Sequence, residues 1–401
     1  MGSQAYLWQR AWTPAVIEAA EVAFGKTDAP GEFDRLVLLA AELTPSDGSG
    51  GTVIVQPDYA ACRRGGGSVG LAIRINAYSG QFEADGAITR HLVEVVSAVL
   101  ASARSGGVEP MELQVDFDCP TARLAGYCLW IQAVRKTAAP VPVVITALPS
   151  WMGSRDFGKL VEATDGFVLQ VHSADPRLLT AEGGVLCDPA AARAAVERAG
   201  EFGRPFRVAL PTYSYLSGVN EAGKLVGLAA EAGRPSWSDS VRLVRFSSDP
   251  SAMAALVRGW TADRPASMTG VIWYRLPVTG DKLNWHRRTL AAVAAGRCPR
   301  AIVTAAAARA EPSLSEIIIR NEGDADSPLP EELSMSWSGA ELVACDGLAG
   351  MQIVAKGKTN ASVAPRDKAV GLIRPGQTIK AAWVRLDKDT EIRVDVISNA
   401  K

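Results

Sequence analysis

Residues 111–136 read MELQVDFDCPTARLAGYCLWIQAVRK and contain the two patterns that decide the fold. The first part, Met111 to Asp118, alternates apolar and polar side chains as a strand does. The second part, Ala122 to Lys136, has the apolar spacing of a helix, and a turn with Pro120 separates the two. The segment therefore predicts one β-strand followed directly by one α-helix.

The same order of strand, turn and helix repeats between residues 5 and 278. Eight runs rich in Val, Ile and Leu are strand candidates: Tyr6 to Trp12, Arg35 to Leu43, Ser68 to Ala77, Met111 to Asp118, Val141 to Trp151, Gly166 to His172, Phe206 to Tyr213 and Gly270 to Pro277. Seven helical stretches accompany them: Thr13 to Ala23, Ala87 to Ala103, Ala122 to Lys136, Asp156 to Ala163, Pro189 to Phe202, Ser251 to Thr261 and Asp281 to Ala295. Eight such strands predict an α/β fold, a (β/α)8 barrel of the TIM type.

Two stretches depart from this order. After the second strand, Val53 to Val55 resembles a further strand rather than a helix, and the glycine-rich run Arg64 to Gly67 follows it. Between the seventh strand and its helix, Tyr215 to Val244 is an insertion. We expect this insertion to form a hairpin over the barrel mouth, the end at which the strands finish.

The pattern changes near residue 300. An Ala-rich segment, Ala305 to Ala310, is expected to be a linker, and short alternating runs separated by turn signals follow it. These runs predict a C-terminal immunoglobulin-like β-sandwich. We therefore expect a barrel over residues 1–304, as the catalytic or carbohydrate-binding domain, and an accessory β-sandwich over residues 305–401.

The composition excludes several classes of protein. Lys and Arg total 42 and Asp and Glu total 43, so no basic field is available and nucleic acid is not an expected partner. No apolar run approaches the roughly 20 residues that span a bilayer, so no transmembrane segment is expected. The start Met1-Gly2-Ser3 resembles a cloning remnant. We expect a natural leader to have been removed and a periplasmic or secreted location, although the sequence leaves a cytoplasmic one open.

Cofactor and metal motifs are missing from the sequence. No GxGxxG follows the first strand, and there is no phosphate loop ending in Gly-Lys-Ser/Thr, no HExxH and no GxSxG, so no cofactor is expected. The six cysteines lack zinc spacing and are expected to be mostly free thiols, with one or two disulfides left open. Because His91 and His286 fall on predicted helices, no metal site is expected; a mixed carboxylate and His172 site is a minor alternative.

The fourth strand carries the clearest candidate site. Gln114, Asp116 and Asp118 share one face of this strand, and we expect that face to point into the barrel, where chemistry on this fold takes place at the strand ends. Two neighbouring carboxylates raise one another's proton affinity, which keeps an acid protonated near neutral pH. Asp118 is the predicted general acid and Asp116 its electrostatic partner. The alternative is a salt bridge from Asp116 to Arg10 or Arg74, with Asp118 only capping the next helix.

Other strand ends supply one further candidate acid, Glu42, and a set of candidate substrate-binding residues. The binding candidates are Arg10, Trp12, Arg74, Asn76, Gln114, Trp151, Gln170, His172, Tyr213, Trp273 and Arg275. Aromatic rings stack on sugar faces, and amides and acids bond to hydroxyls, so an oligosaccharide or polysaccharide is the expected partner. Core packing is the alternative for each Trp, and a structural role is the alternative for His172.

Several of these stretches resemble one uncharacterised bacterial family, known as domain of unknown function 3142. The resemblance lies in Tyr6 to Trp12, in Gln114 to Thr121 with Arg123, Leu124 and Tyr127, in Ile145 to Trp151 and in Val168 to His172. It implies a barrel like those of glycoside hydrolases but no assigned activity.

A more distant likeness is to the family 18 chitinase-type barrels, whose fourth strand carries DxxDxDxE. Asp116 and Asp118 match the second and third acids of that pattern, but Pro120 stands where the final Glu belongs. Since that Glu is the family's proton donor, Asp118 or Glu42 has to take the acid role in a hydrolase.

These observations support two main hypotheses of function. The first is a glycoside hydrolase that acts on a bacterial or environmental polysaccharide through carboxylates at the strand ends. The alternative is a non-catalytic carbohydrate-binding or cell-envelope interaction protein on a degenerate barrel. A metal-dependent hydrolase of another class is a third option.

Overall fold

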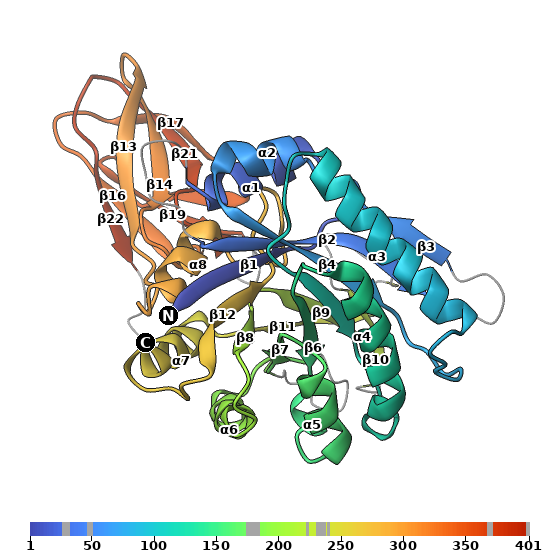
Figure 1. The fold of residues 1–401 in the computed structure, drawn as a ribbon. Coiled ribbons are helices and arrows are strands. Elements are labelled where there is room, and N and C mark those ends of the chain that lie inside the picture. Colours follow the sequence, from blue (N-terminus) through green and yellow to red (C-terminus); the bar gives the residue numbers. More distant parts are fainter. Residues whose placement is uncertain are drawn as a thin grey trace. The chain divides into compact units, whose positions relative to one another are not determined.

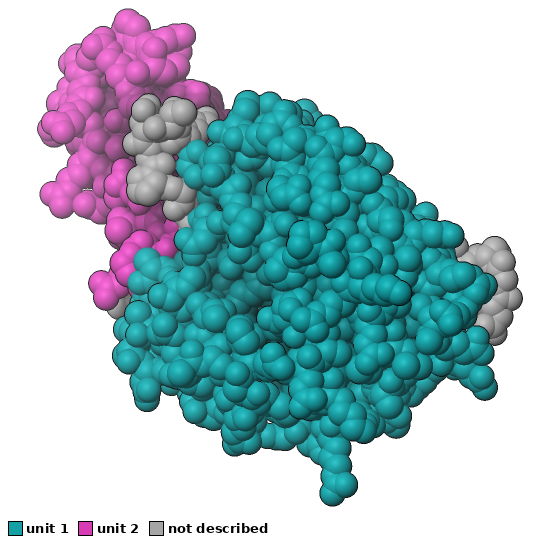
Figure 2. Space-filling model, in the orientation of Figure 1, with its two compact units in different colours: residues 1–287, 294–296 teal, residues 288–293, 297–401 magenta. Residues whose placement is uncertain are grey.

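The structure is a computed structural model that describes residues 1–25, 33–45, 51–173, 185–221, 224–229, 238, 241–366 and 372–397. The chain forms two compact units, shown in different colours in Figure 2. The first comprises residues 1–287 with 294–296, and the second comprises residues 288–293 with 297–401.

Eight parallel strands close into a barrel in the first unit (Figure 1). They run in the order β1-β12-β8-β7-β6-β5-β4-β2, and pairing of β1 with β2 closes the ring. The strands are β1 (Gly2–Leu7), β2 (Arg35–Thr44), β4 (Ser68–Ile75), β5 (Leu113–Phe117), β6 (Val143–Ala147), β7 (Gly166–Gln170), β8 (Phe206–Pro211) and β12 (Met268–Tyr274). The predicted TIM-type barrel is confirmed.

Helices follow the strands along the chain. They are α1 (Pro14–Ala23), α2 (Tyr59–Gly65), α3 (Ala87–Ser105), α4 (Leu124–Ala138), α5 (Arg155–Glu162), α6 (Pro189–Gly200), α7 (Pro250–Ala262) and α8 (Arg287–Ala294), with 3-10 turns η1 (Thr121–Arg123) and η2 (Pro149–Trp151). The predicted start of α6 is present, because the Asp188 carboxylate accepts hydrogen bonds from the N–H groups of Ala190 and Ala191. Pro189 then occupies the first helical position.

The prediction for the first strand was wrong in its bounds. β1 starts at Gly2 and ends at Leu7, so Arg10 and Trp12 lie beyond it rather than on it. Gly2 pairs with Gly270 of β12 so closely that a Cβ on Gly270 would lie 2.5 Å from the Gly2 carbonyl oxygen. The first half of this strand consists of small and polar residues, so the sequence has no apolar run there that would predict a strand.

The connection between β2 and β4 contains both a strand and a helix. β3 (Gly51–Ile54) pairs antiparallel with β2, in agreement with the strand-like reading of Val53. The glycine run that follows is the end of α2, with Gly66 in the left-handed conformation at φ 72°. Gly67 allows a close approach, because a Cβ there would lie 1.7 Å from the Phe24 ring.

The insertion after β8 forms three antiparallel strands rather than a two-stranded hairpin. They are β9 (Ser214–Val219), β10 (Leu225–Ala229) and β11 (Arg242–Ser247), in the order β10-β9-β11. β9 begins only three residues after β8 ends, so the insertion starts directly at the barrel mouth.

The second unit is mostly antiparallel β-structure. Its strands are β13 (Val303–Glu311), β14 (Leu314–Asn321), β15 (Ser327–Pro328), β16 (Glu332–Ser336), β17 (Leu342–Gly347), β18 (Met351–Ala355), β19 (Asn360–Pro365), β20 (Leu372–Ile373), β21 (Thr378–Leu386) and β22 (Arg393–Ile397). Sheets β13-β14-β21-β17 and β18-β19-β16-β22 share one core that includes Ile319, Met335, Val363 and Val384. The predicted β-sandwich is confirmed.

One segment of this unit was predicted wrongly. Ala305 to Ala310 lies within β13, which pairs with β14 along its length, and is not a linker. Alanine side chains are small and are common in helices and linkers, so their alternation along this strand gives no clear strand signal.

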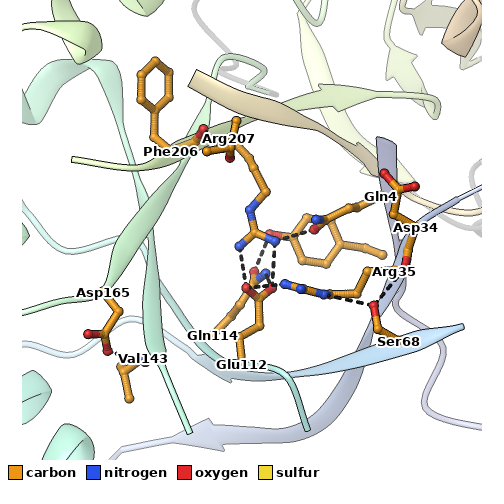
Figure 3. A network of polar contacts seen from close by, with 12 residues as sticks. Gln4, Asp34, Arg35, Ser68, Glu112, Gln114, Val143, Asp165, Phe206 and Arg207 are labelled. Carbon is orange, nitrogen blue, oxygen red and sulfur yellow. Dashed lines mark hydrogen bonds and ion pairs between the residues drawn. The ribbon is translucent and has the colours of Figure 1, made fainter. Parts of the chain in front are cut away.

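An ion network fills the barrel interior at the end opposite the mouth (Figure 3). The Glu112 carboxylate accepts hydrogen bonds from Arg207 at 2.8 and 2.9 Å and from Arg35 at 2.9 Å. Burial alone would raise the pKa of Glu112, but the charges of the two arginines lower it. The network therefore holds an ionised carboxylate inside the barrel.

Two further hydrogen bonds extend this network through the barrel interior toward the mouth. Gln114 donates to Glu112 at 2.7 Å and accepts from the Tyr6 hydroxyl at 2.6 Å. The Tyr6 ring lies in a layer of inward side chains with Val37 and Ile272. These hydrogen bonds thus hold the side chains at the bottom of the mouth in place.

Candidate active site

A cavity of about 530 Å³ opens at the barrel mouth, and we call it the first cavity. It brings together six residues that the sequence predicts as site residues: Arg74, Asp116, Asp118, Gln170, His172 and Tyr213. It also contains residues that the sequence reasoning missed, among them Tyr6, Trp8, Thr146, Tyr215 and Tyr274. The lining comes from the ends of seven barrel strands, β1, β4 to β8 and β12, and from the start of β9.

Arg74 binds both carboxylates of the predicted acid pair. Its Nη1 donates to Asp116 Oδ2 and its Nη2 donates to Asp118 Oδ2, each at 2.7 Å. Thr146 adds a hydrogen bond of 2.7 Å to the other oxygen of Asp116. Asp116 is buried, whereas the side chain of Asp118 is 47% exposed, so Asp118 is the carboxylate that a ligand can reach.

The electrostatics of the pair follow from this difference in burial. Burial raises the pKa of Asp116, and the charge of Asp118 adds to this effect, while Arg74 and Thr146 oppose it. Burial would lower the pKa of Arg74, but its two carboxylate partners raise it, so it stays charged. Asp116 therefore keeps its proton to higher pH than an ordinary aspartic acid would.

The contacts of these two residues match one of their structural alternatives and contradict the other. The salt bridge from Asp116 to Arg74 is present. The helix-cap alternative for Asp118 is wrong, because Asp118 pairs with Arg74 and the turn that follows it has no side-chain cap. One arginine thus holds both carboxylates at the mouth.

His172 is buried in the wall of the first cavity. Its Nδ1 lies 3.2 Å from the Tyr213 hydroxyl, and its ring stacks on Tyr274 with centroids 5.6 Å apart. Its Nε2 has no hydrogen-bond partner among the described residues. Burial lowers the pKa of His172 to about 4, so the ring is neutral at physiological pH.

This burial predicts a pH dependence of stability. Because the folded-state pKa of His172 lies below its unfolded value of about 6.5, the unfolded chain binds more protons between these pH values. The free energy of unfolding should therefore fall, by on the order of 3 kcal/mol, as the pH drops from about 6.5 to about 4. Urea unfolding at several pH values should show a weaker fall in His172→Gln. The same pH profile in both proteins would contradict this prediction.

Aromatic side chains form the rest of the wall. Trp8 meets Tyr6 edge to face at 5.3 Å and Tyr274 at 5.4 Å, and Tyr213 meets Tyr215 at 5.1 Å. Such rings offer apolar faces together with hydroxyl groups that bond to a polar ligand.

Two of the predicted tryptophan platforms are wrong. Trp151 and Trp273 are fully buried, and the Trp151 indole donates to the Cys119 carbonyl at 2.9 Å. On β12 it is Tyr274 that faces the cavity, and side chains alternate along a strand, so Trp273 faces away from the mouth. Trp12 is half-buried and does not line the first cavity.

Two predicted amides also lie elsewhere. Gln114 is on the inward face as predicted, but it is fully buried below the first cavity, where it bonds to Tyr6 and Glu112. Asn76 lies outside the cavity and donates to Thr44 at 2.8 Å.

Arg10, Glu42 and Arg275 line a second cavity, of about 680 Å³. Arg10 pairs with Glu42, and Arg275 pairs with Asp281 at 2.7 Å. Glu42 is thus separated from the acid pair, although it remains in the same barrel.

No group of three His, Cys, Asp or Glu side chains in the described part of the chain is arranged to hold a metal ion. Cys62, Cys119, Cys128, Cys187 and Cys345 are free thiols. Over the described residues, no helix is long and apolar enough to cross a membrane.

The comparison with known families concerns this same barrel. A family described as Domain of unknown function (DUF3142) matches residues 69–279. The chain belongs to this family. The DUF3142 match extends from β4 to β12 and includes Arg74, Asp116, Asp118 and His172. No curated protein sequence matches this DUF3142 chain.

Several solved structures are similar to the DUF3142 chain at low identity. The spore cortex-lytic enzyme SleL of Bacillus cereus is 12% identical, with 73% of this chain and 74% of SleL covered and a TM-score of 0.49. The chitinase ChiA74 of Bacillus thuringiensis is 10% identical, with 98% and 100% covered and a TM-score of 0.46. A family GH18 chitinase of Chromobacterium violaceum is 11% identical, with 100% and 89% covered and a TM-score of 0.42. Likeness at this level does not assign an activity.

Proposed function

We propose that this DUF3142 barrel is a glycoside hydrolase whose acid is the Asp116 and Asp118 pair. The observation that carries the proposal is a coupled carboxylate pair at the end of β5, inside a cavity walled by aromatic rings. Glycosidic bond cleavage needs a carboxyl group that stays protonated and a site that binds sugar rings.

In this proposal Asp118 is the group that contacts the substrate. It donates a proton to the leaving glycosidic oxygen as the bond from that oxygen to the anomeric carbon breaks, and water then supplies the hydroxyl of the new reducing end and returns its other proton to the Asp118 carboxylate. Arg74 stabilises the Asp118 carboxylate that remains. The buried Asp116, whose pKa is raised by burial and by the charge of Asp118, holds a proton next to Asp118 before the reaction.

The walls of the first cavity would bind the sugar. The rings of Trp8 and Tyr274 offer apolar surface, and the unpartnered Nε2 of the neutral His172 offers a hydrogen bond to a hydroxyl group. The proposal includes a catalytic role for residues 1–304, an accessory role for residues 305–401 and a periplasmic or secreted location, where polysaccharides are available.

A second candidate function is carbohydrate binding without catalysis. It is favoured by Arg74, which bonds to both carboxylates and so stabilises their charged forms. It is also favoured by Pro120, which occupies the position of the acid in the chitinase-type pattern.

Asp118→Asn separates the two functions. We expect this variant to lose roughly 10²–10⁴-fold in turnover, the usual contribution of a general acid, and to keep its affinity for oligosaccharide. Product analysis and calorimetry on a panel of glycans measure the two quantities. Because Asp118 is half-exposed, the melting temperature should change little.

The matched control is Asp156→Asn, which removes a partly exposed carboxylate on α5, outside both cavities. It should leave turnover unchanged. If the wild type binds a glycan but releases no product over long incubation between about pH 4 and pH 8, the non-catalytic function replaces the hydrolase.

A further inference from the structure

The two cavities of the barrel are neighbours at three points. Trp8 lines both of them. Arg275 of the second cavity follows Tyr274 of the first along the chain. Glu42 of the second cavity pairs in register with Arg74 of the first, across β2 and β4. Together the cavities lie over the ends of all eight barrel strands, with the second over β2, the first over β4 to β8, and both over β1 and β12.

The charges of the second cavity are balanced. Its lining contains two arginines and two carboxylates, joined as the pairs Arg10 with Glu42 and Arg275 with Asp281. The first cavity contains Arg74 against two carboxylates. Neither lining carries the surplus of positive charge that attracts a polyanion, but both present many donors and acceptors for hydroxyl groups.

Each cavity also holds a buried polar atom that has no hydrogen-bond partner among the described residues. In the first cavity this is Nε2 of His172, a residue that is 6% exposed, and in the second it is Oε1 of Gln9. Buried polar atoms in folded proteins are almost always bonded to protein, water or ligand. Both cavities, at about 530 and 680 Å³, also fall within the usual range of ligand sites.

We infer that the two cavities form one extended site, in which an uncharged polysaccharide chain lies across Trp8 with successive sugar units on either side. The inference rests on the proposed carbohydrate function and adds to it the length and the charge of the substrate. A chain of several units should bind more tightly than a disaccharide, because only the longer chain reaches both cavities.

Ala11→Trp tests this inference by filling the second cavity, since Ala11 is an exposed residue of its lining. The probes are the disaccharides and hexasaccharides of β-1,4-linked glucose, N-acetylglucosamine, xylose and mannose. They are titrated by calorimetry into the wild type and into Asp118→Asn, in which cleavage is suppressed. We expect the best hexasaccharide to bind at least about tenfold more weakly to Ala11→Trp, and its disaccharide to bind within about twofold of the wild type.

Two further variants keep the test independent of folding defects. Ala101→Trp places the same ring on the exposed face of α3, outside both cavities, and should bind all probes like the wild type. Thr13→Phe narrows the second cavity at another position of its lining and should repeat the selective loss of hexasaccharide binding.

The outcomes separate this inference from the proposed function. Unchanged hexasaccharide affinity in both folded cavity variants would overturn the extended site and leave the hydrolase standing. Tighter binding of hexagalacturonate than of any neutral hexamer would overturn the uncharged substrate. Chain-length-dependent binding without product from the wild type would overturn the hydrolase alone, and a lack of binding by every neutral hexamer would overturn both.

Discussion

Replacing Glu112 with Gln should lower the free energy of unfolding by about 3–5 kcal/mol, because it leaves Arg207 charged and buried inside the barrel without its anion. The side chains of Glu112 and Arg207 are 6% and 8% exposed, so water cannot replace the lost partner. Urea unfolding followed by tryptophan fluorescence measures the loss, because eight of the ten tryptophans lie in residues 1–287 of the barrel unit.

The control for this prediction is Glu109→Gln. Glu109 pairs with Arg104 at the surface of the same unit, with both side chains well exposed, and its loss should change stability by less than about 1 kcal/mol. Adding Arg207→Met to Glu112→Gln should recover most of the stability, because the stranded charge is then removed. If Glu112→Gln behaved like Glu109→Gln, the ion network would not support the barrel as described.

Replacing Arg74 with Met should cause a loss of stability that depends on pH. The buried Asp116 then has no counter-ion, and at neutral pH the free energy of unfolding should fall by about 3–5 kcal/mol. Burial already raises the pKa of Asp116, and removing Arg74 raises it further. A folded state that binds the extra proton gains stability as the pH falls, so the loss should shrink between about pH 7 and pH 5.

Urea unfolding of Arg74→Met at both pH values tests this expectation. The double variant with Asp116→Asn is the control, because it removes the stranded charge and should be less destabilised at pH 7. An equal loss at both pH values would indicate that Arg74 contributes packing and not charge.

Periodicity in the sequence was sufficient to find the barrel. All eight strands lie at or near their predicted places, since buried parallel strands produce apolar runs that local inspection detects. Periodicity did not predict the strand segments that consist of small residues, such as Gly2 and Ser3 in β1 and the alanines of β13. These segments form strands because they pair with distant parts of the chain, and a local sequence pattern does not show such pairing.

The site was predictable only in part, for a geometric reason. Alternation on β5 correctly grouped Asp116 and Asp118, but on β12 a one-residue error in parity selected Trp273 in place of Tyr274. The sequence also does not show how far from the mouth a side chain lies along its strand. Gln114 and Asp116 share a face, but only Asp116 lines the first cavity. The ion-pair link between Glu112 and Arg207 joins residues 95 positions apart, and no pattern in the sequence indicates that they are partners.

That link has a consequence for how the protein can change over evolutionary time. The network ties together β1, β2, β8 and the start of β5 at one end of the barrel, while the cavities and the β9-β10-β11 insertion occupy the other. Substitutions at mouth residues other than Arg74 and Asp116 therefore leave the buried ion pairs intact, and new specificities can evolve there without a large loss of stability. A library randomised at Tyr215 and at the exposed Ala11 should accordingly yield mostly folded variants, which makes this barrel a tolerant scaffold for selecting binders of other glycans.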